Sequence, residues 1–224
     1  MLKKELFFFK NLKTLFWVPL VFLFVVMPVC IGGIFNASAE YEREAILQTL
    51  IFMQQIIPIF STWWIVFILR EYIDGDGAEI LYTYEGIYTS KLKVVLLTLG
   101  VYLVCAATDY LLLWFLYPTQ GELFLLDYLK TAFICFFLNG GTYFLMYFLR
   151  STVVGIVSSI VYYFAISLSG QMGNPFISAY FDYGGAQGAF VTWGELGRHY
   201  SIVFVLSCSL LLFGYLRERE YRVH

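Results

Sequence analysis

Acidic and amide side chains inside long apolar stretches are the residues of this 224-residue chain best placed to do chemistry. A charged or amide group in lipid is costly, so it usually faces another helix, a water-filled cavity or a transported molecule. Asp109 is the acid that lies deepest in an apolar stretch. We expect it to line a cavity, to form a salt bridge with Lys130, or to be solvated near the membrane surface. The amides Gln54, Gln55 and Asn139 could line a transport path or form hydrogen bonds between helices, and the sequence leaves both alternatives open.

Catalytic and cofactor motifs are missing from the sequence. Neither H-E-x-x-H nor G-x-S-x-G occurs, and both histidines, His199 and His224, lie outside the apolar stretches. The phosphate-binding pattern G-x-x-x-x-G-K-[ST] is also absent, since Gly-Lys never occurs. We therefore expect the chain not to be an enzyme and to hold no metal or other cofactor.

Six apolar stretches dominate the composition, which is 60% hydrophobic and only 13% charged. Soluble domains average about 25% charged residues. About 20 helical residues cross a hydrocarbon core of about 30 Å, and backbone groups in lipid must be satisfied within the segment. The sequence thus predicts an all-α polytopic membrane protein with six transmembrane helices in one domain over residues 1–224. The stretches are 14–35, 47–69, 94–117, 128–149, 153–173 and 200–216.

Basic residues predict the orientation. With the N-terminus in the cytoplasm, eleven Lys and Arg residues fall inside the cell and three, Arg43, Lys130 and Arg198, fall outside. Short loops follow the positive-inside rule, so both termini are expected in the cytoplasm. A net charge of -2 gives no indication of a nucleic-acid partner.

Three short segments outside the apolar stretches have helical patterns of their own. Residues 2–13 place lysines on one face and apolar side chains on the other, which predicts an interfacial helix on the inner leaflet. Residues 78–88 predict a short, acidic and aromatic amphipathic helix in the cytoplasm, a docking element for a protein partner or else a solvated loop. Outside, Asn174 and Pro175 suit a helix start, and Gly184 and Gly185 would end that helix. We expect a re-entrant helical hairpin there, an irregular loop being the alternative.

In its order of elements the chain resembles the permease subunit of type-2 ABC exporters. That family has an interfacial N-terminal helix, six spans, a cytoplasmic coupling helix after span two and an outer helical excursion before span six. Its motif after span two is an acid, then G-T-x-E-x-L-L, then a proline and a basic residue. Ala78 stands here in place of the threonine, and no proline occurs between Gly77 and Lys91. The resemblance assigns to this motif Glu71, Gly77, Ala78, Glu79, Ile80, Leu81 and Lys91.

The resemblance implies a function, partners and further sites. It implies an exporter of a hydrophobic or amphipathic substrate, such as an antimicrobial peptide, a drug or a lipid-like molecule, in a bacterial plasma membrane. Two separate ATPase subunits, which would hold ATP and Mg²⁺, would bind the motif residues and Tyr84. A second permease copy or homologue would be a further partner. The outer hairpin would act as a gate. An ion-coupled carrier without an ATPase is the alternative. The seam with the second permease would contain Gly32, Gly33, Gly155, Ser158 and Ser159.

Overall fold

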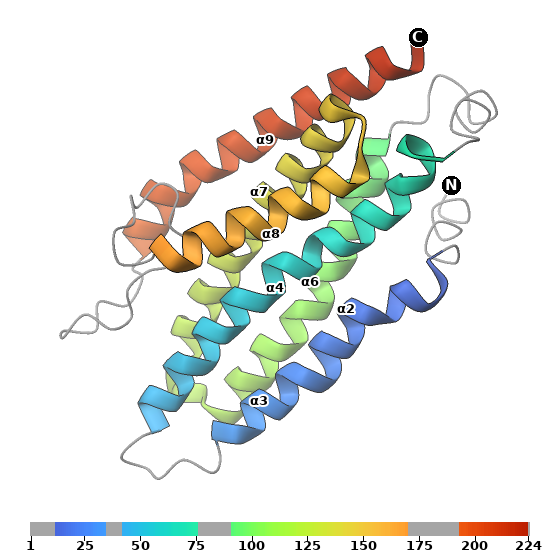
Figure 1. The fold of residues 1–224 in the computed structure, drawn as a ribbon. Coiled ribbons are helices and arrows are strands. Elements are labelled where there is room, and N and C mark those ends of the chain that lie inside the picture. The colour runs from blue at the N-terminus through green and yellow to red at the C-terminus, as the bar shows by residue number, and fades with distance from the viewer. Residues whose placement is uncertain (1–11, 35–41, 76–90, 170–192, 224) are drawn as a thin grey trace.

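The protein is a bundle of long helices that run in similar directions (Figure 1). The computed structural model describes residues 12–34, 42–75, 91–169 and 193–223. Apart from short connections, all of these residues are helical. In chain order the helical segments are η1 (Lys13–Phe16), α2 (Trp17–Val21), η2 (Phe22–Val26), α3 (Met27–Ile34), α4 (Glu42–Ile73), α6 (Lys91–Leu116), η3 (Pro118–Gln120), α7 (Gly121–Leu149), α8 (Thr152–Ser169) and α9 (Trp193–Val223).

Five helical stretches in the described part of the chain are long and apolar enough to cross a membrane. The prediction of an all-helical membrane protein is therefore confirmed. The helix α8 coincides with the predicted fifth stretch, but its described apolar part, Thr152–Val161, is shorter than a crossing requires. The count of six spans thus stays a prediction. The five stretches are Lys13–Ile34, Glu44–Ile73, Lys91–Leu116, Pro118–Leu149 and Leu196–Glu220.

The first membrane stretch is irregular, and proline explains part of its packing. It begins with the 3₁₀ turn η1 and contains the π-helical segment η2. Pro19 has no N–H, so the carbonyl of Leu15, four residues earlier, lacks its usual helical donor. The indole of Trp63 on α4 donates to that carbonyl at 3.2 Å, and Trp64 donates to the Phe16 carbonyl at 3.0 Å. These bonds fasten the start of the first stretch to α4.

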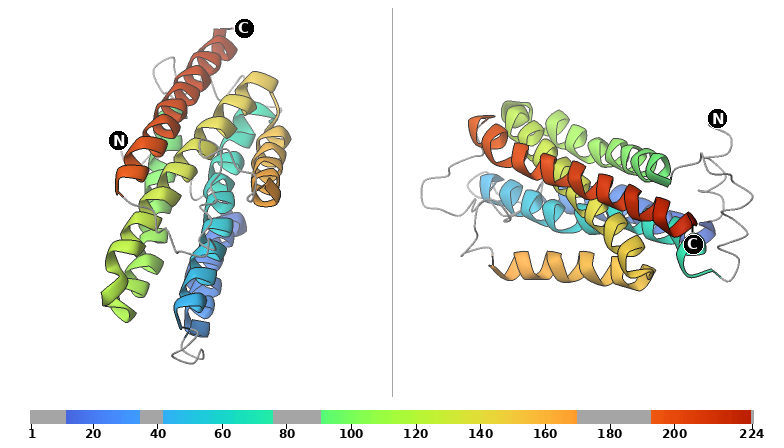
Figure 2. Two further views of the ribbon diagram at one scale, coloured as in Figure 1. Left: turned by 90° about the vertical axis from the view of Figure 1, so that its left-hand side faces the viewer. Right: turned by 90° about the horizontal axis from the view of Figure 1, so that it is seen from above.

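The helices α4 and α7 form the centre of the bundle. The helix α7 packs against α4, α6, α8 and α9, while α4 also packs against α3, α6 and α8. Viewed from above, α6 and α8 lie on opposite sides of this central pair (Figure 2). Because α4 and α7 are covered from several directions, polar side chains on them can meet partners away from lipid.

Glycines bring α7 and α9 close together. A Cβ at Gly214 would lie 2.5 Å from the ring of Tyr143, and one at Gly140 would lie 3.1 Å from the Ser207 carbonyl oxygen. Small residues allow helices in membranes to approach until their backbones nearly touch. The contact between α7 and α9 therefore depends on the absence of these two side chains.

The connection from α7 to α8 is very short. The helix α7 ends at Leu149 and α8 begins at Thr152, with Arg150 in the left-handed conformation at φ 53° and ψ 42°. Such a residue commonly ends a helix, although glycine is the usual choice. The predicted interfacial helix (except residues 12–13), the predicted coupling helix and the predicted outer hairpin lie outside the described residues.

Candidate functional site

A buried cluster of polar and charged side chains joins α4, α6 and α7. The cluster, called the Asp127 cluster, consists of Gln54, Tyr110, Asp127, Lys130 and Thr131, each at most 4% exposed. Lys130 donates to the Gln54 amide oxygen at 2.9 Å, and the Gln54 amide nitrogen donates to Asp127. The Tyr110 hydroxyl donates to the other Asp127 oxygen at 2.9 Å and lies 3.1 Å from the Thr131 hydroxyl. An acid and a base are thus connected through one amide in the interior of the bundle.

The cluster lies inside the membrane stretches. Asp127 is six residues from the start of α7, which is about 9 Å along the helix axis. On α6, Tyr110 is six residues before the helix ends, so it lies at a similar depth. Asp127, Lys130 and Thr131 are spaced by three and four residues, which places them on one face of α7. Buried charges at such a position are expensive, and in membrane proteins they usually belong to a functional path or a structural pair.

Lys130 therefore corrects one part of the sequence analysis. The charge pattern places it among the basic residues outside the membrane, but its side chain is fully buried within the bundle. Asp127 went unnoticed because it precedes the apolar stretch at 128–149. The sequence signal that could have identified this cluster is the spacing of Asp127, Lys130 and Thr131. Three polar residues on one face of an apolar helix indicate a polar contact.

Asp109, the acid singled out from the sequence, is buried on α6 at 2% exposed. Its Oδ2 atom accepts no hydrogen bond from the described residues. Lys130 donates to Gln54, and in the described part of the chain no salt bridge joins Asp109 to Lys130. Burial argues against solvation of Asp109 at the membrane surface.

Another of the three predicted amides, Asn139, forms a hydrogen bond to a neighbouring helix. Its amide nitrogen donates to the Ser61 hydroxyl on α4 at 2.8 Å and to the Cys135 carbonyl at 2.7 Å. Its amide oxygen is buried and accepts no hydrogen bond from the described residues. Gln54 likewise bonds to α7, whereas Gln55 is only half-buried. Two of the three amides thus connect α4 to α7.

At the opposite end of the bundle, carboxylates from other helices bind two helix starts. This end, called the Arg70 end, is where α4 stops and α6 and α8 begin. The Asp74 carboxylate accepts the Thr152 backbone N–H at 3.3 Å and also accepts its hydroxyl. Thr152 is the first residue of α8. A carboxylate at this position satisfies an unpaired N–H and interacts favourably with the helix dipole.

Glu218 does the same for α6. Its carboxylate, 1% exposed, accepts the backbone N–H of Lys91 at 3.0 Å and the hydroxyl of Tyr143. Glu218 is not expected as a site residue from the sequence because the last apolar stretch ends at residue 216. The signal was the spacing from Leu211 and Gly214, which continues a buried face of α9 at helical intervals.

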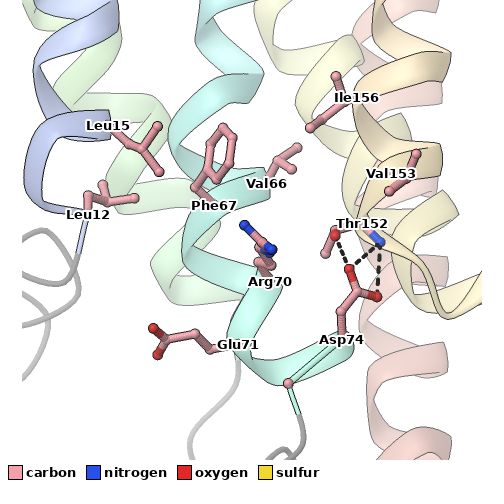
Figure 3. A pocket seen from close by; sticks show the side chains of 11 residues that line it. Leu12, Leu15, Val66, Phe67, Arg70, Glu71, Asp74, Thr152, Val153 and Ile156 are labelled. Atoms are coloured by element: carbon pink, nitrogen blue, oxygen red, sulfur yellow. Dashed lines mark hydrogen bonds between the residues drawn. The ribbon is translucent and has the colours of Figure 1, made fainter.

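A cavity of about 530 Å³ opens beside Asp74 at the Arg70 end. Figure 3 shows it between η1, α4 and α8, with α4 between the other two. Apolar side chains form much of its lining, and three charged residues of α4 and its end lie along it. Leu12, Leu15, Val66, Phe67, Arg70, Glu71, Asp74, Gly75, Thr152, Val153 and Ile156 line the cavity.

Only two of the predicted ATPase-binding residues are described. Glu71 is exposed, as a docking residue should be. Lys91 is 2% exposed, and its ammonium lies over the Tyr72 ring at 3.6 Å from the centroid. Lys91 therefore offers little surface to a partner. Gly77, Ala78, Glu79, Ile80, Leu81 and Tyr84 lie outside the described residues, as do the gate residues Asn174, Pro175, Gly184 and Gly185.

The predicted seam residues lie in two different surroundings. A Cβ at Gly155 would lie 2.6 Å from Met146 on α7, and the hydroxyl of Ser159 is 2.7 Å from that of Thr142. These residues pack α8 on α7 within one chain. Ser158 is half-buried and donates to the Gly155 carbonyl at 3.1 Å. By contrast, a Cβ at Gly32 or Gly33 would have no neighbour within 4 Å among the described residues.

The described side chains set limits on the chemistry of the site. In the part of the chain that the structure describes, no three His, Cys, Asp or Glu side chains gather as metal ligands would. No protein-family model matches the chain, and no curated protein or solved structure matches it either. The function is therefore inferred from the buried polar cluster, the two bound helix starts and the cavity.

Proposed function

We propose that the chain is the membrane-spanning permease subunit of an ATP-driven ABC exporter. It moves a hydrophobic or amphipathic substrate outward, and separate ATPase subunits that bind segment 71–91 supply the energy. The partners are two such ATPases, which hold ATP and Mg²⁺, and a second permease copy or homologue. The chain lies in a plasma membrane with both termini in the cytoplasm.

One observation supports this proposal above the others: described residues on either side of segment 76–90, Asp74 and Lys91, are bonded to other helices. At its start, Asp74 is bonded to the first residue of α8. At its end, the Lys91 backbone is bonded to Glu218 on α9, and the Lys91 side chain rests on Tyr72 of α4. A displacement of the segment would therefore be passed to α4, α6, α8 and α9 together.

The strength of these attachments fits a mechanical role. A hydrogen bond to a charged group contributes about 1.5–3 kcal/mol, and each end of the segment has at least one. Such attachments are strong enough to move with a partner that pushes the segment, and weak enough to be rearranged during a transport cycle.

The test separates binding of the ATPase from transmission of its motion. In native membranes, Glu79→Ala with Leu81→Ala should release the co-purifying ATPase and abolish transport. Thr152→Val should retain the ATPase but lower the substrate transported per ATP hydrolysed, because it removes the hydroxyl that bonds to Asp74. Lys93→Ala, an exposed residue at the same end, is the matched control.

Two results would refute the proposal. One is purification of the intact chain without any ATPase partner. The other is normal ATPase binding and transport in the Glu79→Ala, Leu81→Ala variant while Lys93→Ala behaves as wild type.

The Asp127 cluster favours a second candidate, an ion-coupled carrier. Carriers use buried ionisable groups within their helices, and this bundle contains Asp109 besides the connected Asp127 and Lys130. Vesicles that contain only this chain distinguish the two. Uptake driven by an imposed ion gradient without ATP would support the carrier, and its absence would support the permease.

A further inference from the structure

The cavity at the Arg70 end has walls that are fixed on both sides of α4. On one side, Trp63 bonds to the Leu15 carbonyl that Pro19 leaves without a helical donor. On the other side, Asp74 bonds to Thr152 at the start of α8. Both bonds hold lining residues of the cavity in place. The space is therefore preformed, which is the usual state of a small-molecule site.

The cavity is amphipathic along the direction of the helices. Figure 3 shows Val66, Phe67 and Ile156 on the side toward the interior of the bundle. Arg70, Glu71 and Asp74 lie toward the end of α4, where the membrane stretch Glu44–Ile73 stops. An occupant would thus place an apolar part among hydrocarbon side chains and a polar part at the membrane surface.

The charged residues of the cavity differ in whether their side chains already have hydrogen-bond partners. Both oxygens of Asp74 accept bonds from Thr152. Within the described part of the chain, no hydrogen bond or ion pair engages the side chain of Arg70 or of Glu71. Figure 3 shows the Arg70 guanidinium between the walls and the Glu71 carboxylate turned toward the η1 side. As far as the described residues go, one positive and one negative group are thus available to bind a ligand.

We propose that this cavity binds a zwitterionic phospholipid of the inner leaflet whose headgroup carries a phosphate and a primary amine. The phosphate binds the guanidinium of Arg70, which suits phosphate oxygens because its N–H groups form a planar fork. The ammonium group binds Glu71. The first part of an acyl chain lies against Phe67 and Ile156. A volume of about 530 Å³ accommodates a headgroup and the adjoining methylene groups, but not a whole lipid.

The charge balance distinguishes this lipid from others. Arg70 contributes one positive charge, and Glu71 and Asp74 contribute one negative charge each, so the lining carries a net charge of -1. A headgroup with net negative charge would bring its excess charge next to two carboxylates. A choline headgroup has no N–H to donate to Glu71. A headgroup with both a phosphate and a primary amine satisfies both free side chains.

Native mass spectrometry of the purified chain tests the proposal. Protein in detergent is exposed to equal amounts of phosphatidylethanolamine, phosphatidylcholine and phosphatidylglycerol. Wild type should retain phosphatidylethanolamine in preference to the other two. Arg70→Gln should lower that retention by about tenfold or more, since a hydrogen bond between charged groups is lost. Glu71→Gln should shift the preference toward phosphatidylglycerol while Arg70 still binds phosphate.

Controls separate this site from general lipid binding. Lys93→Gln removes an exposed charge at the same end and should leave retention unchanged. Glycerophosphoethanolamine, which has no acyl chains, should not displace the lipid. Equal retention of all three lipids, equal behaviour of the Arg70 and Lys93 variants, or displacement by the chain-free headgroup would overturn the proposal. The measurement needs no ATPase, so its failure is distinguishable from failure of the proposed transport function, even though Glu71 also lies in the segment proposed to bind the ATPases.

Discussion

Replacement of Lys130 by methionine should strongly destabilise the protein. Lys130 is fully buried and donates to Gln54, whose amide in turn binds Asp127. Its loss leaves the Asp127 carboxylate in the interior without the balancing positive charge. Removal of one partner of a buried ion pair costs about 3–5 kcal/mol. An ordinary polar bond between membrane helices is worth only about 0.6 kcal/mol, so the two cases are readily told apart.

The companion change supplies the sharper measurement. Asp127→Leu alone should cost a similar amount, because it leaves Lys130 as the unbalanced charge. Replacement of both residues removes both charges, and apolar substitutes for a buried pair are often neutral. The double variant should therefore be more stable than the sum of the single effects predicts, by about 3 kcal/mol or more.

Reversible unfolding in mixed detergent micelles, followed by circular dichroism, measures these free energies. Lys93→Met is the control, and it should change the free energy of unfolding by no more than about 0.5 kcal/mol because Lys93 is exposed. If the effects of the two single substitutions simply add, to within about 0.5 kcal/mol, Asp127 and Lys130 are not energetically coupled and the reasoning fails.

Two further predictions concern helix packing. Gly155→Val should lower the free energy of unfolding by about 1–3 kcal/mol because even a Cβ would lie 2.6 Å from Met146. Gly32→Val, where a Cβ would meet no described atom within 4 Å, should cost clearly less in the same assay. Equal costs would contradict this packing of α8 on α7. Trp63→Phe should destabilise by about 1 kcal/mol through the unpaired Leu15 carbonyl, and Pro19→Ala should reduce that cost by restoring a helical N–H. A Trp63→Phe cost that is the same in the wild-type and Pro19→Ala backgrounds would show that the indole bond is unrelated to the proline.

Much of the fold could be predicted because membrane helices leave a local signal. The stretch expected at 94–117 became α6, Lys91–Leu116, and the stretch at 47–69 became the centre of α4. Each such helix satisfies its own backbone groups, so length and hydropathy are enough to locate it. The ends were less predictable: α4 and α9 extend beyond their apolar parts because charged residues at helix ends can reach water or a partner.

The candidate site was only partly predictable. Gln54 and Asn139 were identified as amides in apolar stretches, and both bond across helices. Asp127 and Glu218 were missed because each lies at the edge of its stretch, where an acid is ordinarily solvated. Their burial results from a neighbouring helix that covers them, and no pattern within α7 or α9 alone specifies that neighbour.

By itself, the sequence determined that this protein is a helical membrane protein, roughly where its helices lie, and which polar residues interrupt them. Only the tertiary structure decided that Lys130 is connected to Asp127 through Gln54, that Glu218 binds the start of α6, and that Asp74 binds the start of α8. The physical reason is one of range. Helical periodicity acts over a few residues and fixes which face a side chain occupies, whereas these bonds join residues more than 70 positions apart and depend on how whole helices pack.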